Sequence, residues 1–446
     1  MSLPYRLARR LVSLILAIFF SRIEASGLEN VPGGRPILFA ANHPNEMLDP
    51  FLIGHFHEGR VNFLAKSTLF GFKPMGWLLR ALGGIPVYRQ RDAAEQMSRN
   101  EDSFRECYDA LEAGEAIGIF PEGTSHSQPS LMPLKTGAAR IVLTAEAARG
   151  FQLGVRIVPV GLHYTHAEEF RSDAVAVFGP AIEPARYAQT FATEPQRAVR
   201  ELTAELEAGL RAITVNFRES DEAVLVDQVR KIFRHELPQF TPDQGPGGDY
   251  ELTRAIVDGY YRALEREPER ISRLRQRVSA YFGILRLSGL RPGAADVKPT
   301  GALRHLARVV PAGVLGLPVA LHGLFYNWIP YRIPRWYTEW ADLEEVERAT
   351  FKIGVGAVSF SIAYAAETAA VAWLAGPWVA AAFLATLPVT GLFALHYFEV
   401  AAVFLRDARS FLVFLTDLDL ARRLRTMRGE LRTELADLAQ AYLAGK

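Results

Sequence analysis

Between about residues 35 and 180, short apolar runs alternate with amphipathic stretches along the chain. The apolar runs predict strands, at 36–41, 61–65, 116–120, 156–164 and 174–178. The stretches between them space apolar residues three or four apart and predict helices, at 74–82, 97–113 and 136–149. Strands that alternate with helices are typical of an α/β layer fold. From residue 195 to about 290 the pattern is polar and helical, with a Pro/Gly-rich break at 238–248.

Two long apolar segments follow toward the C-terminus. Ile353–Ala375 carries one charged residue and Trp378–Phe398 carries none. A helix that spans a bilayer needs about 20 apolar residues, and Gly376-Pro377 between the segments is a turn signal. The pattern predicts a transmembrane hairpin with spans at 353–375 and 378–398. Two helices buried in a large soluble core are the alternative.

A third apolar stretch, Val309–Ile329, has no Asp, Glu, Lys or Arg but contains Pro311 and Pro318, which interrupt helical hydrogen bonding. If it crosses the membrane, the basic residues that flank the hairpin lie opposite the N-terminal domain. Basic residues near spans favour the cytoplasmic side. We therefore favour a two-span hairpin, with 309–329 re-entrant or interfacial, over three spans.

The N-terminus is a second membrane candidate. Arg6, Arg9 and Arg10 precede Leu11–Phe20, an apolar run that is too short to span alone. A basic end with an apolar stripe is typical of an interfacial helix, which we place at 1–24. A signal or anchor sequence and a core helix are the alternatives.

Composition narrows the class of protein. The chain has 446 residues, of which 49% are hydrophobic and 22% charged, so a largely disordered chain is excluded. Its net charge of +1 gives no sign of nucleic-acid binding. The single cysteine, Cys107, excludes an intrachain disulfide and any cysteine-based zinc site.

The first cluster with chemical potential is Asn42-His43-Pro44-Asn45-Glu46-Met47-Leu48-Asp49, directly after a predicted strand. His43 can accept and donate a proton near neutral pH, and a carboxylate a turn or two later can bond its other ring nitrogen. No Ser or Cys nucleophile lies beside it. That absence indicates direct attack by a substrate hydroxyl, with His43 as the base. A capping loop in which Asp49 opens a helix is the alternative, and a metal site is less favoured.

Three further clusters follow in the chain. Gly83–Arg89 ends on an arginine that could hold a phosphate, although a surface arginine is the plainer interpretation. Phe120–His126 places Glu122 beside Gly123 after a strand, and Lys135 opens the helix that follows, an arrangement that favours an anion. Ile157–Gly161 is best interpreted as a buried strand with a proline kink.

The four clusters together, in this order and spacing, resemble the glycerolipid acyltransferase family, which includes glycerol-3-phosphate and lysophosphatidic acid acyltransferases. The resemblance covers about residues 20–185, through blocks of the form N-H-x4-D, G-x-I-x-I-x-R, F-P-E-G-T-R and V-P-V. It implies that His43 and Asp49 are the catalytic pair. It also implies a set of substrate-binding residues: Arg89, Glu122, Gly123, Thr124, Lys66 and Lys135.

Two positions depart from the family pattern. Five residues, not four, separate His43 from Asp49, which makes Glu46 an alternative partner for the histidine. This N-H-P-N-x-x-x-D-P form is similar to the branch that contains fungal glycerol-3-phosphate/dihydroxyacetone-phosphate acyltransferases, which also carry C-terminal membrane helices. Ser125 stands where the family usually has arginine, so one phosphate contact is missing or supplied elsewhere.

The resemblance and the pattern together give a domain plan. We expect an α/β acyltransferase domain, a mixed sheet flanked by helices, at 25–190, then a helical region at 191–300. A membrane region at 301–400 contains the C-terminal membrane-helix hairpin, and a cytoplasmic helical tail occupies 401–446.

The expected activity is transfer of a fatty acyl group from acyl-CoA or acyl carrier protein to glycerol 3-phosphate or 1-acylglycerol 3-phosphate, in the synthesis of phosphatidic acid. No cofactor or metal is expected, and membrane lipid is the expected partner, at the cytoplasmic face of the inner membrane. Lysophospholipid remodelling, transacylation or an inactive lipid-binding protein are the alternatives.

Overall fold

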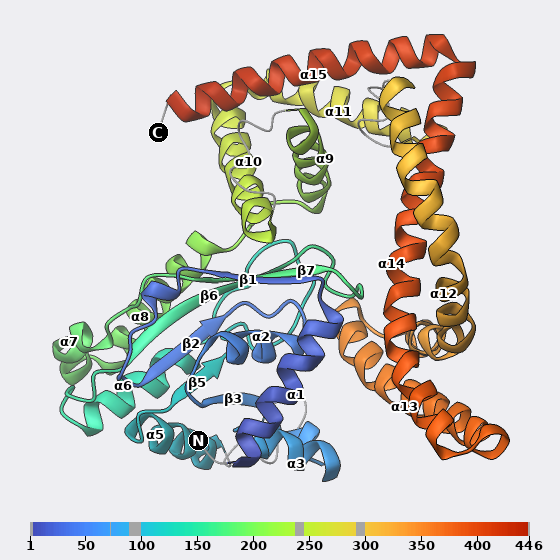
Figure 1. Ribbon diagram of the computed structural model, residues 1–446. Coiled ribbons are helices and arrows are strands. Elements are labelled where there is room, and N and C mark those ends of the chain that lie inside the picture. Colours follow the sequence, from blue (N-terminus) through green and yellow to red (C-terminus); the bar gives the residue numbers. More distant parts are fainter. Residues whose placement is uncertain (1–2, 72, 89–99, 237–244, 291–298, 445–446) are drawn as a thin grey trace. The chain divides into compact units, whose positions relative to one another are not determined.

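The structure is a computed structural model that describes residues 3–71, 73–88, 100–236, 245–290 and 299–444. The chain divides into two compact units (Figure 1). The first unit comprises Met1–Ser220, Gly245–Tyr250 and Glu344–Thr350. The second unit comprises Asp221–Gln244, Glu251–Leu343 and Phe351–Lys446.

A seven-stranded mixed sheet lies at the centre of the first unit, in the order β1-β7-β6-β2-β5-β3-β4. Its strands are β1 (Arg22–Ser26), β2 (Ile37–Ala41), β3 (Val61–Lys66), β4 (Ile85–Val87), β5 (Ala116–Ile119), β6 (Arg156–Tyr164) and β7 (Asp173–Phe178). The five strands from β6 to β4 run parallel, whereas β7 is antiparallel to β6. The carboxyl ends of these five strands therefore meet at one edge, where α/β folds place their ligands.

Helices cover this sheet and complete its core. They are α1 (Leu3–Phe19), α2 (Leu48–Phe56), α3 (Lys73–Ala81), α5 (Asn100–Glu112), α6 (Gly137–Ala148), α7 (Ala188–Thr193) and α8 (Pro195–Ile213). Leu202, Leu206 and Leu210 of α8 are fully buried and share one core with the sheet and α6. Their four-residue spacing gives α8 one apolar face. The first unit consequently continues to Ser220 and does not end at the expected boundary of 190.

The predicted α/β class with a mixed sheet is confirmed, and each of the five predicted strands is present within a residue or so of its expected bounds. β4 and β1 were not predicted as strands. β1, with the sequence Arg-Ile-Glu-Ala-Ser, is an edge strand that has no apolar run to reveal it. The helix expected at 1–24 ends at Phe19, because the chain enters the sheet at Arg22.

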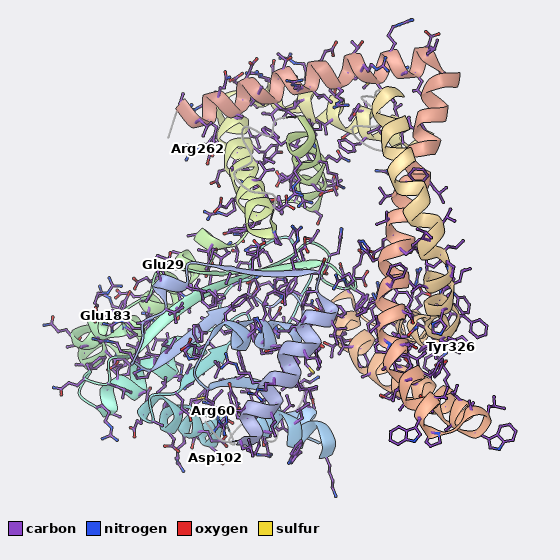
Figure 2. All side chains as sticks on the ribbon, in the orientation of Figure 1. Glu29, Arg60, Asp102, Glu183, Arg262 and Tyr326 are labelled. Atoms are coloured by element: carbon purple, nitrogen blue, oxygen red, sulfur yellow. The ribbon has the colours of Figure 1, made fainter. Side chains whose placement is uncertain are left out.

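The second unit is helical, and four of its helices share one hydrophobic core. These are α9 (Ser220–Glu236), α10 (Pro246–Arg266), α11 (Pro268–Ser288) and α15 (Leu418–Ala444). Arg277 of α11 makes ion pairs with Glu434 at 2.6 Å and Glu430 at 2.9 Å, both on α15. The guanidinium of Arg262, labelled in Figure 2, lies 5.1 Å from the ring centroid of Tyr442. The C-terminal tail is therefore packed on helices that precede the membrane region.

Three long helices lie in the segment predicted as the membrane region: α12 (Pro299–Trp340), α13 (Glu345–Ala375) and α14 (Pro377–Thr416). Among the described residues, α13 and the Pro377–Leu405 part of α14 are long and apolar enough to span a membrane, by length and composition. Their mean hydropathies are 1.4 and 1.9. These two helices contain the predicted spans at 353–375 and 378–398.

α12 contains the stretch 309–329 and runs through its prolines as one helix, so the structure does not support a re-entrant reversal there. Proline at 334 cannot donate to the carbonyl of Pro330. That carbonyl instead accepts a hydrogen bond from Ser359 Oγ of α13, at 3.0 Å. α12 also packs closely on α14, since a Cβ at Gly323 would lie 2.0 Å from the carbonyl oxygen of Thr390. Small residues are what permit such close helix contacts in membranes.

Candidate active site

The predicted site residues gather where the parallel strands end. β2 leads into Asn42 and His43, β5 leads into the loop that contains Glu122, and β3 ends at Lys66. β6 runs beside β2 and ends at Tyr164. The loops after neighbouring strands β2 and β5 are joined directly, because the His126 amide donates to the His43 carbonyl at 3.2 Å.

His43 and Asp49 form the pair that the sequence predicts. His43 Nδ1 lies 2.8 Å from Asp49 Oδ2, and the Asp49 side chain is completely buried. The backbone amide of Asn45 donates to the same oxygen at 2.8 Å, and the Tyr164 hydroxyl donates to Oδ1 at 2.7 Å. Because the amide donates to it, Oδ2 is an acceptor, so Nδ1 carries the proton when the carboxylate is ionised. Nε2 is then the nitrogen that can receive a proton from a substrate.

The extra residue between His43 and Asp49 is accommodated at Glu46. Its φ is +33°, outside the regions that a non-glycine residue normally adopts. After this local turn, Asp49 lies in the first turn of α2 with its carboxylate at the histidine ring. Burial and, secondarily, the nearby Glu347 raise the pKa of Glu46. Asp49, and not Glu46, is the hydrogen-bonding partner of the ring.

Contacts from three sides hold the loop that carries His43. The imidazole stacks on Phe120 with ring centroids 3.9 Å apart and an interplanar angle of 10°. The Asn42 side chain donates through Nδ2 to the Leu162 carbonyl at 3.0 Å and accepts through Oδ1 from the Leu162 backbone amide at 2.7 Å. Asn45 donates to the Ala167 carbonyl at 2.7 Å. The histidine is therefore placed by its neighbours before any substrate binds.

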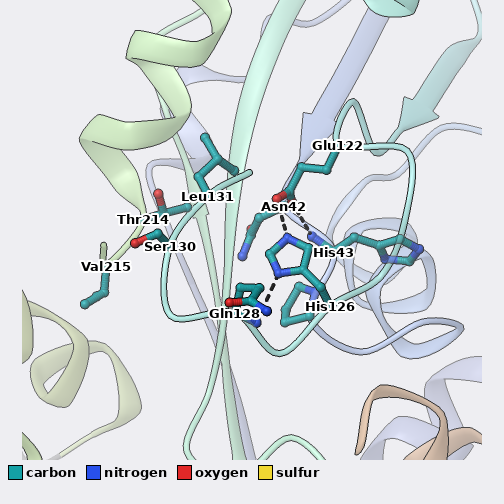
Figure 3. Close-up of a pocket in the computed structure, with 10 residues that line it drawn as sticks. Asn42, His43, Glu122, His126, Gln128, Ser130, Leu131, Thr214 and Val215 are labelled. Atoms are coloured by element: carbon teal, nitrogen blue, oxygen red, sulfur yellow. Dashed lines mark hydrogen bonds and ion pairs between the residues drawn. The ribbon is translucent and has the colours of Figure 1, made fainter. Parts of the chain in front are cut away.

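Glu122 is held by hydrogen bonds within the protein. Its side chain is completely buried. Oε1 accepts from the His43 amide at 3.1 Å and Oε2 accepts from His126 (Figure 3). Oε2 also accepts from the Met132 amide at 2.8 Å. In this structure Glu122 holds the loops after β2 and β5 together, and its contact with substrate stays a prediction.

His126 is occupied at both ring nitrogens. Nδ1 accepts a hydrogen bond from the Gln128 amide at 3.1 Å, so the ring proton is on Nε2, which faces Glu122. In this arrangement the ring has no donor left for a phosphate. His126 therefore does not replace the arginine that is missing at Ser125.

Gly123 and Lys135 lie together. The φ of Gly123 is +76°, and a Cβ at this position would lie 2.3 Å from Lys135 Nζ and 2.7 Å from its Cε. The lysine side chain thus lies against the glycine backbone, and its own amide donates to the Pro121 carbonyl at 2.8 Å. Lys135 is exposed, and no ion pair joins it to another described residue. It is a cation available to an anionic ligand.

The other predicted binding residues are less informative. Lys66 ends β3, at the same edge of the sheet as His43, and acts on Glu46 by lowering its pKa against the larger effect of burial. The Thr124 hydroxyl makes a long 3.3 Å hydrogen bond to the Ser125 carbonyl. Arg89 lies outside the described residues.

A small pocket of about 50 Å³ opens beside His43 (Figure 3). The pocket is lined by residues of the loops after β2 and β5 and by two residues that follow α8. The lining residues are Asn42, His43, Pro44, Glu122, His126, Gln128, Ser130, Leu131, Thr214 and Val215. The loop and the segment after α8 are joined, since the Leu131 amide donates to Asn216 Oδ1 at 2.9 Å. Among the described residues, no group of three or more His, Cys, Asp or Glu side chains could hold a metal ion.

Sequence reasoning missed Asn42, Tyr164, His126 and the wall formed by Thr214 and Val215. Asn42 and His126 belong to the clusters that begin at Asn42 and Phe120, and their polar character could have indicated a place in the site. Tyr164 ends a predicted strand, but nothing in the sequence shows that β6 lies beside β2.

Comparison with known proteins agrees with this geometry. Residues 22–163, which carry the sheet edge with His43 and Asp49, match the family described as Acyltransferase. The match and the relatives support the glycerolipid acyltransferase family for this segment. The matched segment of the chain includes β1 to β5 and nearly all of β6.

Three curated relatives support the assignment. The chain is 31% identical to "Glycerol-3-phosphate O-acyltransferase 2" of Saccharomyces cerevisiae, over 43% of this chain and 25% of the relative. It is 32% identical to "Glycerol-3-phosphate O-acyltransferase 1" of the same yeast, over 63% of this chain and 48% of the relative. It is also 31% identical to "Lyso-ornithine lipid O-acyltransferase" of Rhodobacter capsulatus, over 32% of this chain and 48% of the relative. The chain thus spans half or less of the length of these relatives.

Proposed function

We propose that this acyltransferase transfers a fatty acyl group from an acyl thioester to a hydroxyl of glycerol 3-phosphate or 1-acylglycerol 3-phosphate. The observation that carries the proposal is the 2.8 Å contact between His43 Nδ1 and the buried Asp49, which fixes a general base beside a pocket. Two yeast relatives named as glycerol-3-phosphate O-acyltransferases match 43% and 63% of this chain. The donor is acyl-CoA or acyl carrier protein.

The chemistry follows from the orientation of the histidine. The acceptor hydroxyl gives its proton to His43 Nε2 as its oxygen attacks the thioester carbonyl carbon. Asp49 stabilises the imidazolium that forms. The tetrahedral intermediate then collapses with cleavage of the C–S bond, and the proton passes from His43 to the departing thiolate. A general base of this kind contributes typically about 10²–10⁴ in rate.

Lys135 is the described cation best placed to hold the acceptor phosphate. It is exposed, it lies on Gly123, and Gly123 follows the Glu122 that bonds the His43 amide. Arg89 and Lys66 are further candidates for the same role on the basis of the family motif. Together they would compensate for the serine at position 125. Holding the phosphate fixes the hydroxyl beside the base, which is how much of the rate arises.

The outer face of α1 supports membrane association. It presents large apolar side chains that are 46–60% exposed: Leu3, Leu7, Leu11, Leu14 and Ile18. The opposite face is buried through Val12, Leu16 and Phe19. An exposed apolar stripe on a helix that is anchored to the domain by its other face is suited to the acyl boundary of a bilayer. With the apolar helices α13 and α14, it supports a location at the inner membrane, with the active site toward the cytoplasm.

The direct test uses the purified full chain in nanodiscs. Acyl-CoA and acyl carrier protein donors are each combined with glycerol 3-phosphate, 1-acylglycerol 3-phosphate and lysolipids, and product is measured by mass spectrometry. We expect acylation of a phosphate-bearing acceptor, and a loss of about 10²–10⁴-fold in His43→Ala with an unchanged circular dichroism spectrum. Activity of His43→Ala within threefold of wild type would refute the mechanism.

A lysolipid acceptor without a free phosphate is the second candidate. Ser125 removes one cation from the motif, and the Rhodobacter relative is named for acylation of lyso-ornithine lipid. The acceptor panel separates the two. Product from lyso-ornithine lipid, with none from glycerol 3-phosphate or its 1-acyl form, would establish the second candidate.

A further inference from the structure

The carboxylate that supports the catalytic histidine has a partner outside the family motif. The Tyr164 hydroxyl donates to Asp49 Oδ1 at 2.7 Å, while His43 Nδ1 bonds the other oxygen at 2.8 Å. We propose that Tyr164 is a positioning residue that sets the orientation of Asp49, and through it the position of the His43 ring. The proposal rests on the proposed function, in which His43 is the general base.

The tyrosine is held firmly by the fold. It is the last residue of β6, the strand that pairs with β2 and so arrives beside the loop of residues 42–49. Its ring stacks on Phe20, with centroids 5.6 Å apart and an interplanar angle of 24°. Because its ring stacks on Phe20 and its hydroxyl bonds Asp49, the tyrosine favours one rotamer of the aspartate. Each carboxylate oxygen then accepts hydrogen bonds from its own donors.

Physical chemistry gives the direction of the effect. Burial and the Asp49 carboxylate together hold the pKa of Tyr164 well above its ordinary range, so the phenol remains a donor at any working pH. The hydroxyl therefore holds Oδ1 in place while Oδ2 accepts from His43 and from the Asn45 amide. Removal of the hydroxyl should loosen the aspartate and, with it, the histidine ring.

Other titratable groups near the His43–Asp49 pair interact with one another. Glu46 precedes Asp49 on the same loop, and Lys66 and Glu347 act on Glu46. Glu122 and His126 bond one another on the loop after β5. None of these side chains has a described hydrogen bond to the Asp49 carboxylate.

The experiment compares Tyr164→Phe with Tyr187→Phe in the full chain. Tyr187 is a matched control, because its hydroxyl also donates to a carboxylate, Glu205, at 2.7 Å, and burial raises its pKa to about 12. kcat and KM for the acceptor are measured by mass spectrometry of the product. For Tyr164→Phe we expect kcat to fall roughly tenfold, the scale of one hydrogen bond to a charged group. We expect KM for the acceptor to be unchanged, because Tyr164 acts on the histidine pair and not on the acceptor. Tyr187→Phe should match wild type.

A double variant guards against a purely structural explanation. If Tyr164 acts through Asp49, adding Tyr164→Phe to Asp49→Asn should cost less than threefold, because the carboxylate charge is already gone. An equal loss in both backgrounds, or a loss of kcat matched by an equal loss of circular dichroism signal, would show that the hydroxyl only stabilises the fold and would overturn the proposal. A wild type without acyl transfer, in contrast, would contradict the proposed function itself.

Discussion

Gly123→Ala tests whether the backbone conformation after β5 is what allows Lys135 to lie against Gly123. A Cβ at this position would lie 2.3 Å from Lys135 Nζ and 2.7 Å from Cε, so the lysine must leave its place. The φ of +76° costs a non-glycine residue about 1–2 kcal/mol. Loss of a charge-assisted contact to phosphate costs a further ~1.5–3 kcal/mol of binding. The KM for the phosphate-bearing acceptor should therefore rise about 10- to 100-fold.

Two further variants separate the effect of backbone strain from the effect of moving Lys135. Gly114 has nearly the same φ, +74°, but a Cβ there meets nothing within 4 Å. Gly114→Ala should lose the same ~1–2 kcal/mol of unfolding free energy without any change in KM. Lys135→Met keeps the length of the side chain and removes its charge, so it should reproduce the KM effect without the loss of stability.

The measurements are initial rates at saturating donor with varied acceptor, and urea unfolding of each variant. Equal KM values for Gly123→Ala and Gly114→Ala would show that displacement of Lys135 is irrelevant to binding. An unchanged KM in Lys135→Met would remove Lys135 from the phosphate site altogether.

Further outcomes concern the catalytic loop and the membrane. Asp49→Asn should lower kcat more than Glu46→Gln does in the same rate assay, because Asp49 bonds the histidine ring; the reverse order would move the carboxylate role. Leu11→Asp on the exposed face of α1 should reduce the co-sedimentation of a fragment of residues 1–220 with anionic vesicles. Single cysteines at Ser125 and Thr433, without the native cysteine, should both be shielded from a membrane-impermeant thiol reagent in intact cells and both label after lysis.

Much of the first unit could be predicted from its sequence because its strands are apolar runs bounded by turns. The helices α3, α5 and α6 follow from their periodicity and appear close to the expected positions. β1 could not be found in this way, because it is an edge strand whose side chains are only partly buried. The place of α8 was missed because a polar, amphipathic helix does not reveal which surface its apolar face covers.

The site shows the same division between local and long-range information. The motif predicts the pairing of His43 with Asp49 and leaves Glu46 as an alternative partner, and the structure shows the contact with Asp49 and a φ of +33° at Glu46. Glu122 was assigned to substrate by resemblance, yet its burial depends on Met132 and His126 folding back over it. Tyr164 lies 115 residues from its partner Asp49, a separation that no local pattern spans.

The packing of α11 on α15 restricts how the membrane region can cross a bilayer. α11 precedes α12 and α15 follows α14, and the two share one core that is reinforced by the Arg277–Glu434 pair. Helices that share a soluble core lie on the same side of a membrane. We therefore infer that any crossings between residues 289 and 417 are even in number, which favours two spans over three.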